Sequence, residues 1–200
     1  MKTIKSILSW VVPILIGLAI ALLVRSYLFE IVRVDGTSME PNLVNNERVF
    51  VLKQEKIKHL SVIVFDAYGA DPQATPGTEY VKRVIGMPGD KISYKNGNLY
   101  VNNKLVPQKF ISAHERTTGT EIGAEATDWN LASVAKARGW GNKPEKVPAG
   151  EYFVLGDHRT VSNDSRYWGF VKKSEVMGVV KVPFWGCLLY TSPSPRDGAT

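Results

Sequence analysis

The most informative stretch of the chain is residues 79–101, which read EYVKRVIGMPGDKISYKNGNLYV. Short runs of β-branched and aromatic residues alternate here with turn residues, which is the pattern of consecutive strands. Asn96-Gly97 lies between two of these runs. This dipeptide predicts a two-residue hairpin, because both positions of such a turn need positive φ. The stretch therefore predicts antiparallel β-structure.

The same pattern continues on both sides of this stretch, so we expect a mainly β domain built on an antiparallel, barrel-like sheet. Residues 66–78 contain two prolines and two glycines and predict a surface loop. Residues 107–148 are more polar and less periodic, and we interpret them as an insertion with one helix near residues 129–137. The candidate strands are residues 28–34, 48–52, 62–65, 79–85, 91–94, 98–101, 151–155 and 177–182.

The composition excludes several classes of protein. A chain of 200 residues with 44% hydrophobic content can bury a core, which excludes a collagen, a disordered chain and a disulfide-stapled mini-protein. The net charge of +6 comes without a basic block or a nucleic-acid motif, so we expect no nucleic-acid partner. Cys187 is the single cysteine, which rules out an internal disulfide and a multi-cysteine metal site.

The N-terminal region contains an uncharged apolar run, residues 7–24, with lysines before it and Arg25 after it. A helix of this length spans roughly 27 Å, close to the thickness of a bilayer's hydrocarbon core. We therefore predict an uncleaved membrane anchor at residues 7–24. The alternative is a cleavable signal peptide, because Ala19-Ile20-Ala21 has the small-x-small form of a cleavage site. Cations on both sides leave the topology weakly defined.

Two polar segments carry candidate chemistry near the early strands. Gly36 permits a tight turn that could expose Ser38, although a serine in a turn is by itself usually a turn former. In residues 79–85 the strand alternation places Lys82 and Arg83 on opposite faces, so one of the two cations faces inward if either face is packed. A buried lysine has a lowered pKa and can act as a base. The alternative is an edge strand whose cations reach solvent.

A third polar segment, residues 156–169, follows the candidate strand at 151–155 and reads GDHRTVSNDSRYWG. Its density of Ser, Asp and Arg predicts a hydrogen-bonded loop. The candidate ion pairs within it are Asp164–Arg166 and Asp157–Arg159.

The three segments, in this order behind an apolar N-terminal run, resemble bacterial type I signal peptidases. The resemblance is carried by residues 36–41 (GTSMEP), 80–90 (YVKRVIGMPGD), 156–159 (GDHR) and 162–166 (SNDSR). It covers roughly residues 7–184, with residues 107–148 matching only as a variable insertion.

This resemblance implies a membrane-bound Ser/Lys endopeptidase that removes signal peptides from exported preproteins after small-x-small motifs. It implies Ser38 as nucleophile, Lys82 as general base, Ser162 as the residue that orients the lysine, and Asp164 with Arg166 as the pair that holds the loop. Such an enzyme needs no metal and no organic cofactor. Its partners are preproteins and membrane lipid, and we expect a monomer.

The implied topology is a single-pass protein of the bacterial plasma membrane. Residues 1–6 would be cytoplasmic, and residues 25–185 would form the extracytoplasmic protease domain.

The sequence departs from the family pattern at three places. Gly36 stands where some relatives carry a serine that helps the oxyanion hole, so we expect oxyanion stabilisation by backbone N–H groups, including that of Ser38. His158 occupies a position that is commonly asparagine. Residues 186–200 are rich in Pro, Ser and Gly, and we interpret them as a foreign or disordered tail.

Two other functions and one other catalytic mechanism are considered. A self-cleaving Ser/Lys repressor would carry a DNA-binding helix-turn-helix where this chain has its apolar run. A membrane-tethered β binding module would be inactive as an enzyme. A histidine base is the third possibility, but adjacent residues such as Asp157 and His158 cannot readily orient each other as acid and base.

Overall fold

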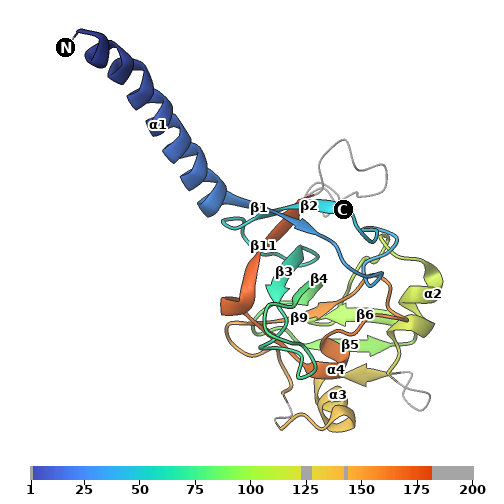
Figure 1. Cartoon of the computed structure of the whole chain (residues 1–200). Coiled ribbons are helices and arrows are strands. Elements are labelled where there is room, and N and C mark those ends of the chain that lie inside the picture. Colours follow the sequence, from blue (N-terminus) through green and yellow to red (C-terminus); the bar gives the residue numbers. More distant parts are fainter. Residues whose placement is uncertain (1, 123–127, 142–143, 182–200) are drawn as a thin grey trace.

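The computed structural model describes residues 2–122, 128–141 and 144–181. An N-terminal helix leads into a β domain made of a seven-stranded and a four-stranded sheet (Figure 1). Every strand pair in both sheets is antiparallel. The predicted fold class, mainly antiparallel β behind one apolar helix, is therefore confirmed.

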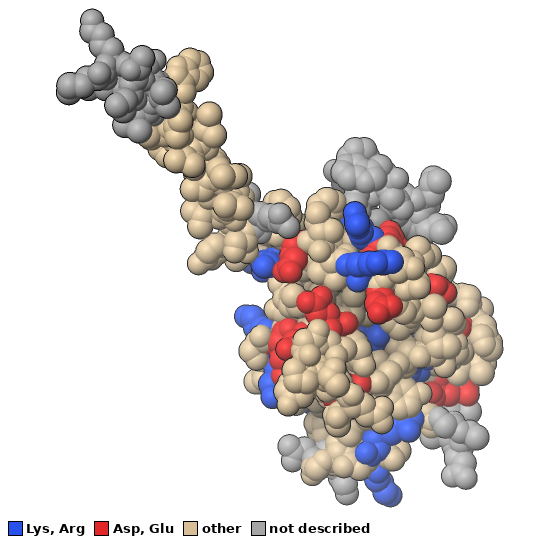
Figure 2. All heavy atoms as spheres, in the orientation of Figure 1, with Lys and Arg blue, Asp and Glu red and all other residues tan. Residues whose placement is uncertain are grey.

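Helix α1 (Lys2–Leu28) projects away from the β domain (Figure 1). Its segment Trp10–Leu28 has a mean hydropathy of 2.2 and no part of it is buried. In Figure 2 the described side chains of this segment are uncharged, whereas Lys, Arg, Asp and Glu lie over the β domain. By length and composition, α1 is a candidate membrane span.

The large sheet contains the residues that position the site. Its strands lie in the order β1 (Phe29–Arg33), β2 (Arg48–Leu52), β11 (Val176–Lys181), β3 (Val62–Asp66), β4 (Glu79–Gly86), β9 (Glu151–Leu155) and β10 (Val171–Lys172). Strand β4 is interior, between β3 and β9. The order is open among the described residues, because the end strands β1 and β10 have no pairing with each other. The sheet itself is therefore not a closed barrel.

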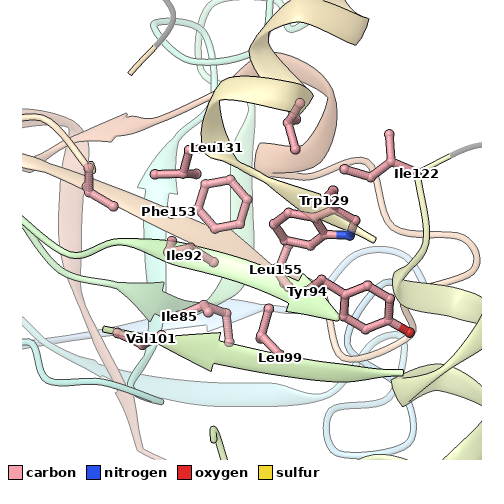
Figure 3. Packing of buried hydrophobic residues seen from close by; sticks show 12 residues of the cluster. Ile85, Ile92, Tyr94, Leu99, Val101, Ile122, Trp129, Leu131, Phe153 and Leu155 are labelled. Atoms are coloured by element: carbon pink, nitrogen blue, oxygen red, sulfur yellow. The ribbon is translucent and has the colours of Figure 1, made fainter. Parts of the chain in front are cut away.

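The small sheet is built on the predicted hairpin. It contains β7 (Lys104–Leu105), β6 (Asn98–Val101), β5 (Ile92–Lys95) and β8 (Trp129–Asn130) in that order. Asn96 and Gly97 have φ values of 49° and 76°, as a two-residue turn between twisted strands requires. Trp129 packs against Tyr94 and Phe153, with ring centroids 5.7 and 6.2 Å apart, in a core cluster that the large sheet also contributes to (Figure 3).

The eight predicted strands are all present. Three have the predicted bounds, and the described ends of the other five differ by one residue, while Val182 lies outside the described residues. The predicted helix at 129–137 begins later, as α3 (Leu131–Arg138), because the Asn130 side chain caps it by accepting a hydrogen bond from the Ser133 N–H. Trp129 and Asn130 are instead strand β8. Through this strand, and through buried Leu131 and Val134, the segment 107–148 contributes to the core rather than lying outside it.

Several short elements were not predicted from the sequence. They are β7, β8 and β10, helices α2 (Ala113–Arg116) and α4 (Ser165–Trp168), and the 3-10 turns η1 (Thr118–Thr120) and η2 (Lys173–Glu175). The proposed tail at 186–200 lies outside the described residues.

Candidate active site

Ser38 lies on a tight turn that follows edge strand β1. Gly36 adopts a positive φ of 91°, which glycine accepts at low cost, and its N–H donates to Asn45 Oδ1 at 3.0 Å. Met39 is buried at 1% exposure and anchors the turn in the core. Ser38 itself is half-buried. The turn therefore holds a serine hydroxyl at the surface of a packed core.

Lys82 reaches this hydroxyl from the middle of the large sheet. Its Nζ lies 2.8 Å from Ser38 Oγ, and 44 residues of sequence separate the two. Because β4 is an interior strand, the edge-strand interpretation of its cations is wrong. Lys82 and Arg83 are both buried, at 4% and 3% exposure, although they point to opposite faces.

The environment of Lys82 favours its neutral form. Burial lowers the pKa of Lys82 to about 8, and the Arg166 guanidinium acts in the same direction, whereas the carboxylates of Asp164, Asp157 and Asp71 oppose the shift. A substantial fraction of Lys82 is thus unprotonated at mildly alkaline pH. An unprotonated amine at hydrogen-bond distance can accept the proton of a serine hydroxyl.

The loop after β9 is held by the predicted Asp164–Arg166 pair. Arg166 Nε and Nη2 each lie 2.9 Å from a carboxylate oxygen of Asp164, and the Gly156 N–H donates to Asp164 Oδ2 at 3.1 Å. Burial alone would raise the pKa of the Asp164 carboxyl, but the guanidinium and these N–H donors hold it below its usual value. Arg166 also donates to the carbonyls of Gly119 and Arg159, which ties the loop to the segment 107–122.

The predicted Asp157–Arg159 pair is wrong, because Asp157 pairs with Arg83. Arg83 Nε and Nη2 lie 2.8 and 2.6 Å from the two Asp157 carboxylate oxygens. Arg83 is opposite Leu155 in the β4–β9 register, which brings its guanidinium close to Asp157 two residues further on. The Arg159 side chain turns away and donates to Gly156 O and Thr120 Oγ1.

Ser162 lies close to the turn that carries Ser38, because Gly156 between them has no side chain. A Cβ at Gly156 would collide with the Ser162 side chain and with Ser38 O, so only glycine permits this approach. Ser162 is 2% exposed, and its hydroxyl has no hydrogen-bond partner among the described residues. Ser162 therefore lies close to Ser38 but forms no direct hydrogen bond with Lys82, and its orientation of the lysine stays a prediction.

His158 contacts the backbone of the turn that carries Ser38 and not the Ser38 hydroxyl. The backbone N–H of His158 donates to Ser38 O at 3.1 Å, and the ring Nδ1 lies 3.2 Å from Thr37 O. Its Nε2 is 4.0 Å from a Glu115 carboxylate oxygen. This placement favours Lys82 over His158 as the base for Ser38.

Some residues near the site were missed by sequence reasoning. Asn42 Nδ2 donates to Asp157 Oδ2 at 2.8 Å and also to Phe110 O. Asn42 thus links the segment that follows Ser38 to the Arg83–Asp157 ion pair. Asp71 is buried and accepts a hydrogen bond from Tyr80, although its segment was predicted only as a surface loop. Neither residue lies in a motif with a chemical signature, so only proximity in the fold reveals them.

A serine hydroxyl paired with a buried lysine amine on an antiparallel β fold has the chemistry of a serine hydrolase that works without histidine. Residues 7–185 match the family model described as signal peptidase, peptidase S26. The chain therefore belongs to the signal peptidase family, peptidase S26, and is a serine endopeptidase.

Two relatives agree with this assignment in their sequences. Signal peptidase I of Bacillus licheniformis is 36% identical over 187 residues, which are 90% of this chain and 90% of that protein. Signal peptidase I P of Bacillus subtilis subsp. natto is 38% identical over 186 residues, with the same coverage of both chains. The crystal structure of a signal peptidase I from Enterococcus faecalis V583 is 30% identical, with a TM-score of 0.49, and covers 64% of this chain and 98% of that one.

Proposed function

We propose that this chain is a membrane-tethered signal peptidase I that cleaves signal peptides from exported preproteins, with Ser38 as the nucleophile and Lys82 as the general base. The observation that carries the proposal is the 2.8 Å contact between Lys82 Nζ and Ser38 Oγ, made by a lysine that is 4% exposed. Membership of the signal peptidase family supplies the substrate class.

The first half of the reaction forms an acyl-enzyme. Neutral Lys82 Nζ accepts the Ser38 hydroxyl proton as Oγ attacks the scissile carbonyl carbon. The resulting lysine ammonium then gives this proton to the leaving amine, and the peptide C–N bond breaks. An ester to Ser38 Oγ remains, and Lys82 is neutral again.

The second half hydrolyses this ester. Lys82 Nζ accepts a proton from water as its oxygen attacks the ester carbonyl. The proton passes to Ser38 Oγ when the C–O bond breaks, which restores both side chains and releases the signal peptide's new carboxyl end.

The oxyanion formed in both halves needs a donor at Ser38. The Ser38 N–H donates no hydrogen bond to the residues that the structure describes, so it is available for this role. The Gly36 N–H is already used by Asn45 Oδ1. The missing serine hydroxyl at position 36 leaves the Ser38 N–H as the donor that we propose.

The fold supports cleavage close to a membrane. Leu28 ends the candidate span, Phe29 begins β1, and the nucleophile turn follows directly after Arg33. A five-residue strand covers roughly 17 Å, so Ser38 would lie within reach of a bilayer surface. Edge strand β1 can pair with an extended substrate segment, whose small side chains would enter shallow pockets.

The corresponding topology is a single-pass protein of the bacterial plasma membrane, acting as a monomer with residues 25–185 outside the cytoplasm. Residues 7–24 then remain as the anchor, and the helix contacts lipid along the exposed side chains of residues 10–23. A repressor would have a DNA-binding module in this place.

The experiment incubates a labelled preprotein with the purified full chain in detergent micelles. We expect one cut after a small-x-small motif, and we expect Ser38→Ala to abolish it. Absence of cleavage by the folded wild-type chain would favour the inactive binding module instead.

A further inference from the structure

Asp71 is a buried carboxylate in the loop between β3 and β4, most of whose other residues are exposed or half-buried. It is 3% exposed. Its Oδ2 accepts hydrogen bonds from the Tyr80 hydroxyl at 3.0 Å and from Asn163 Nδ2 at 2.6 Å, and its Oδ1 accepts one from the Gln73 N–H at 2.9 Å. A buried carboxylate with three donors is a fixed feature of the structure.

Both side-chain partners of Asp71 lie next to the Ser/Lys pair. Tyr80 shares a face of β4 with Lys82, and the lysine Nζ is 5.1 Å from the centre of its ring. Asn163 directly follows Ser162, the hydroxyl that lies close to Gly156 and the carbonyl of Ser38. Asp71 thus connects the tyrosine beside the lysine to the polar loop beside the serine.

The buried charges around the site include the Asp71 carboxylate. Three arginines and three aspartates are buried on β4, in the loop 156–169 and at position 71, so their charges balance when the lysine is neutral. These residues are Arg83, Arg159, Arg166, Asp71, Asp157 and Asp164. Asp157 and Asp164 each form an ion pair with an arginine through both carboxylate oxygens. Asp71 is instead held by the neutral side chains of Tyr80 and Asn163 and by a backbone N–H.

We propose that Asp71 is a positioning residue of this enzyme: it fixes Tyr80 beside the Lys82 amine, holds Asn163 in the loop next to Ser162, and adds one negative charge to the surroundings of the lysine. This inference rests on the proposed role of Lys82 as the base. It assigns a mechanistic function to a loop outside the three motif segments.

The sign of the charge effect follows from electrostatics. The Asp71 carboxylate stabilises the ammonium form of Lys82 and so raises the pKa of Lys82 relative to the value that burial alone would give. Asp164 and Asp157 act in the same direction and more strongly than Asp71, Arg166 opposes them, and Ser38 and Tyr80 are the uncharged polar neighbours. Removing the Asp71 charge should lower the pKa of Lys82 further.

The test measures kcat and kcat/KM for a preprotein substrate against pH, using the full chain in detergent. For Asp71→Asn, which keeps the size of the side chain, we expect the rise of kcat/KM to move to lower pH and kcat at the plateau to fall. Tyr80→Phe should lower kcat without moving the pH profile, because it removes one hydrogen bond and no charge.

Asp66→Asn is the matched control. It removes one carboxylate at the end of β3, where Asp66 accepts a side-chain hydrogen bond from the Tyr68 N–H and from no other described residue. We expect its pH profile to match that of the wild type. A profile of Asp71→Asn that also matches the wild type would overturn the inference.

Lys82→Ala separates this inference from the proposed function. Cleavage by folded Lys82→Ala would refute Lys82 as the base, whereas an inactive Lys82→Ala beside an unshifted Asp71→Asn would refute the role of Asp71 alone. Circular dichroism reports folding. If Asp71→Asn does not fold, Asn163→Ala replaces it, and an unchanged kcat in both Asn163→Ala and Tyr80→Phe would then overturn the inference.

Discussion

At the residue scale, the site depends on one amine that is buried but still able to titrate. Lys82 begins from an ordinary pKa near 10.5, and burial brings it to about 8. The neutral form therefore increases as the pH rises through about 8. Arginine could not replace it, because a guanidinium stays protonated.

The first prediction follows from this titration. We expect kcat/KM of the wild type to rise with pH through an apparent pKa of about 8, because the reactive form of Lys82 is the unprotonated one. Ser38→Ala and Lys82→Ala should each abolish turnover, and the double variant should be no worse than either single one, because the two groups act as one unit. Steady-state kinetics across pH measures both effects. Rescue of turnover by Lys82→Arg would contradict the assignment.

The second prediction concerns His158. His158→Ala should keep substantial cleavage, because the imidazole contacts the carbonyl of Thr37 and not Ser38 Oγ. His59→Ala and His114→Ala serve as controls, since neither side chain contacts Ser38 among the described residues. Complete loss of chemistry in a folded His158→Ala enzyme would show that histidine is the base.

At the scale of single elements, strand β4 places two adjacent cations in two different environments. Lys82 contacts a hydroxyl, whereas Arg83 forms a two-oxygen pair with Asp157 and stacks on the Phe110 ring, with its guanidinium carbon 4.1 Å from the centroid. From the sequence, Arg83 is a mild control for Lys82 because it points to the opposite face. Its burial changes that expectation.

The third prediction is that Arg83→Ala acts mainly on stability. Removing the guanidinium leaves the Asp157 carboxylate buried with only Asn42 as a side-chain donor, and breaking one partner of a buried pair costs about 3–5 kcal/mol. Thermal unfolding should show a clear fall in Tm, while any folded enzyme keeps measurable kcat. Arg138→Ala is the control, because Arg138 is exposed and stacks only on Tyr167. A folded Arg83→Ala enzyme of normal Tm and no turnover would mean that Arg83 acts in the chemistry itself.

At the scale of the whole molecule, a short stretch of the chain connects the candidate span to Ser38. Helix α1 passes directly into β1, and β1 ends at the turn that carries Ser38. The β domain packs its own clusters of buried residues without α1, whose described side chains are exposed from Trp10 to Leu23. Anchoring and folding are therefore separable properties.

The fourth prediction uses this separation. The protein purified from membranes should begin at or near Met1, because an uncleaved α1 remains the anchor, and N-terminal sequencing measures this directly. A chain that lacks residues 1–24 should leave the membrane fraction but keep the Ser38–Lys82 contact. A mature protein that starts at Leu22 would identify Ala19-Ile20-Ala21 as a cleavage site instead.

Much of the fold could be predicted because its signals are local. The Asn96-Gly97 turn, the runs of β-branched residues and the apolar N-terminal run each depend on neighbours in the sequence, and the structure contains the corresponding hairpin, strands and helix. Ser38 and Lys82 were nominated through the resemblance of their motif segments to the signal peptidase family, because the local pattern alone favoured a turn former and an edge-strand cation. Strands of two residues, such as β8, are too short to produce a pattern.

The environments of the site residues could not be predicted in the same way, because packing between distant segments creates them. Alternation along β4 requires one inward cation if either face is packed, but both cations are buried. Ser38 contacts Lys82 on one face, and Asp157 and Phe110 contact Arg83 on the other. The β4–β9 register places Asp157 beside Arg83, so Asp157 pairs with Arg83 and not with Arg159, which is nearby in the sequence. Asp71 lies in a loop of polar composition and becomes buried only where Tyr80 and Asn163 meet it. Local residue preferences therefore specified the strands, and the motif resemblance specified the candidate pair. Burial and charge pairing, which set the pKa of Lys82, arose instead from contacts between segments far apart in the chain.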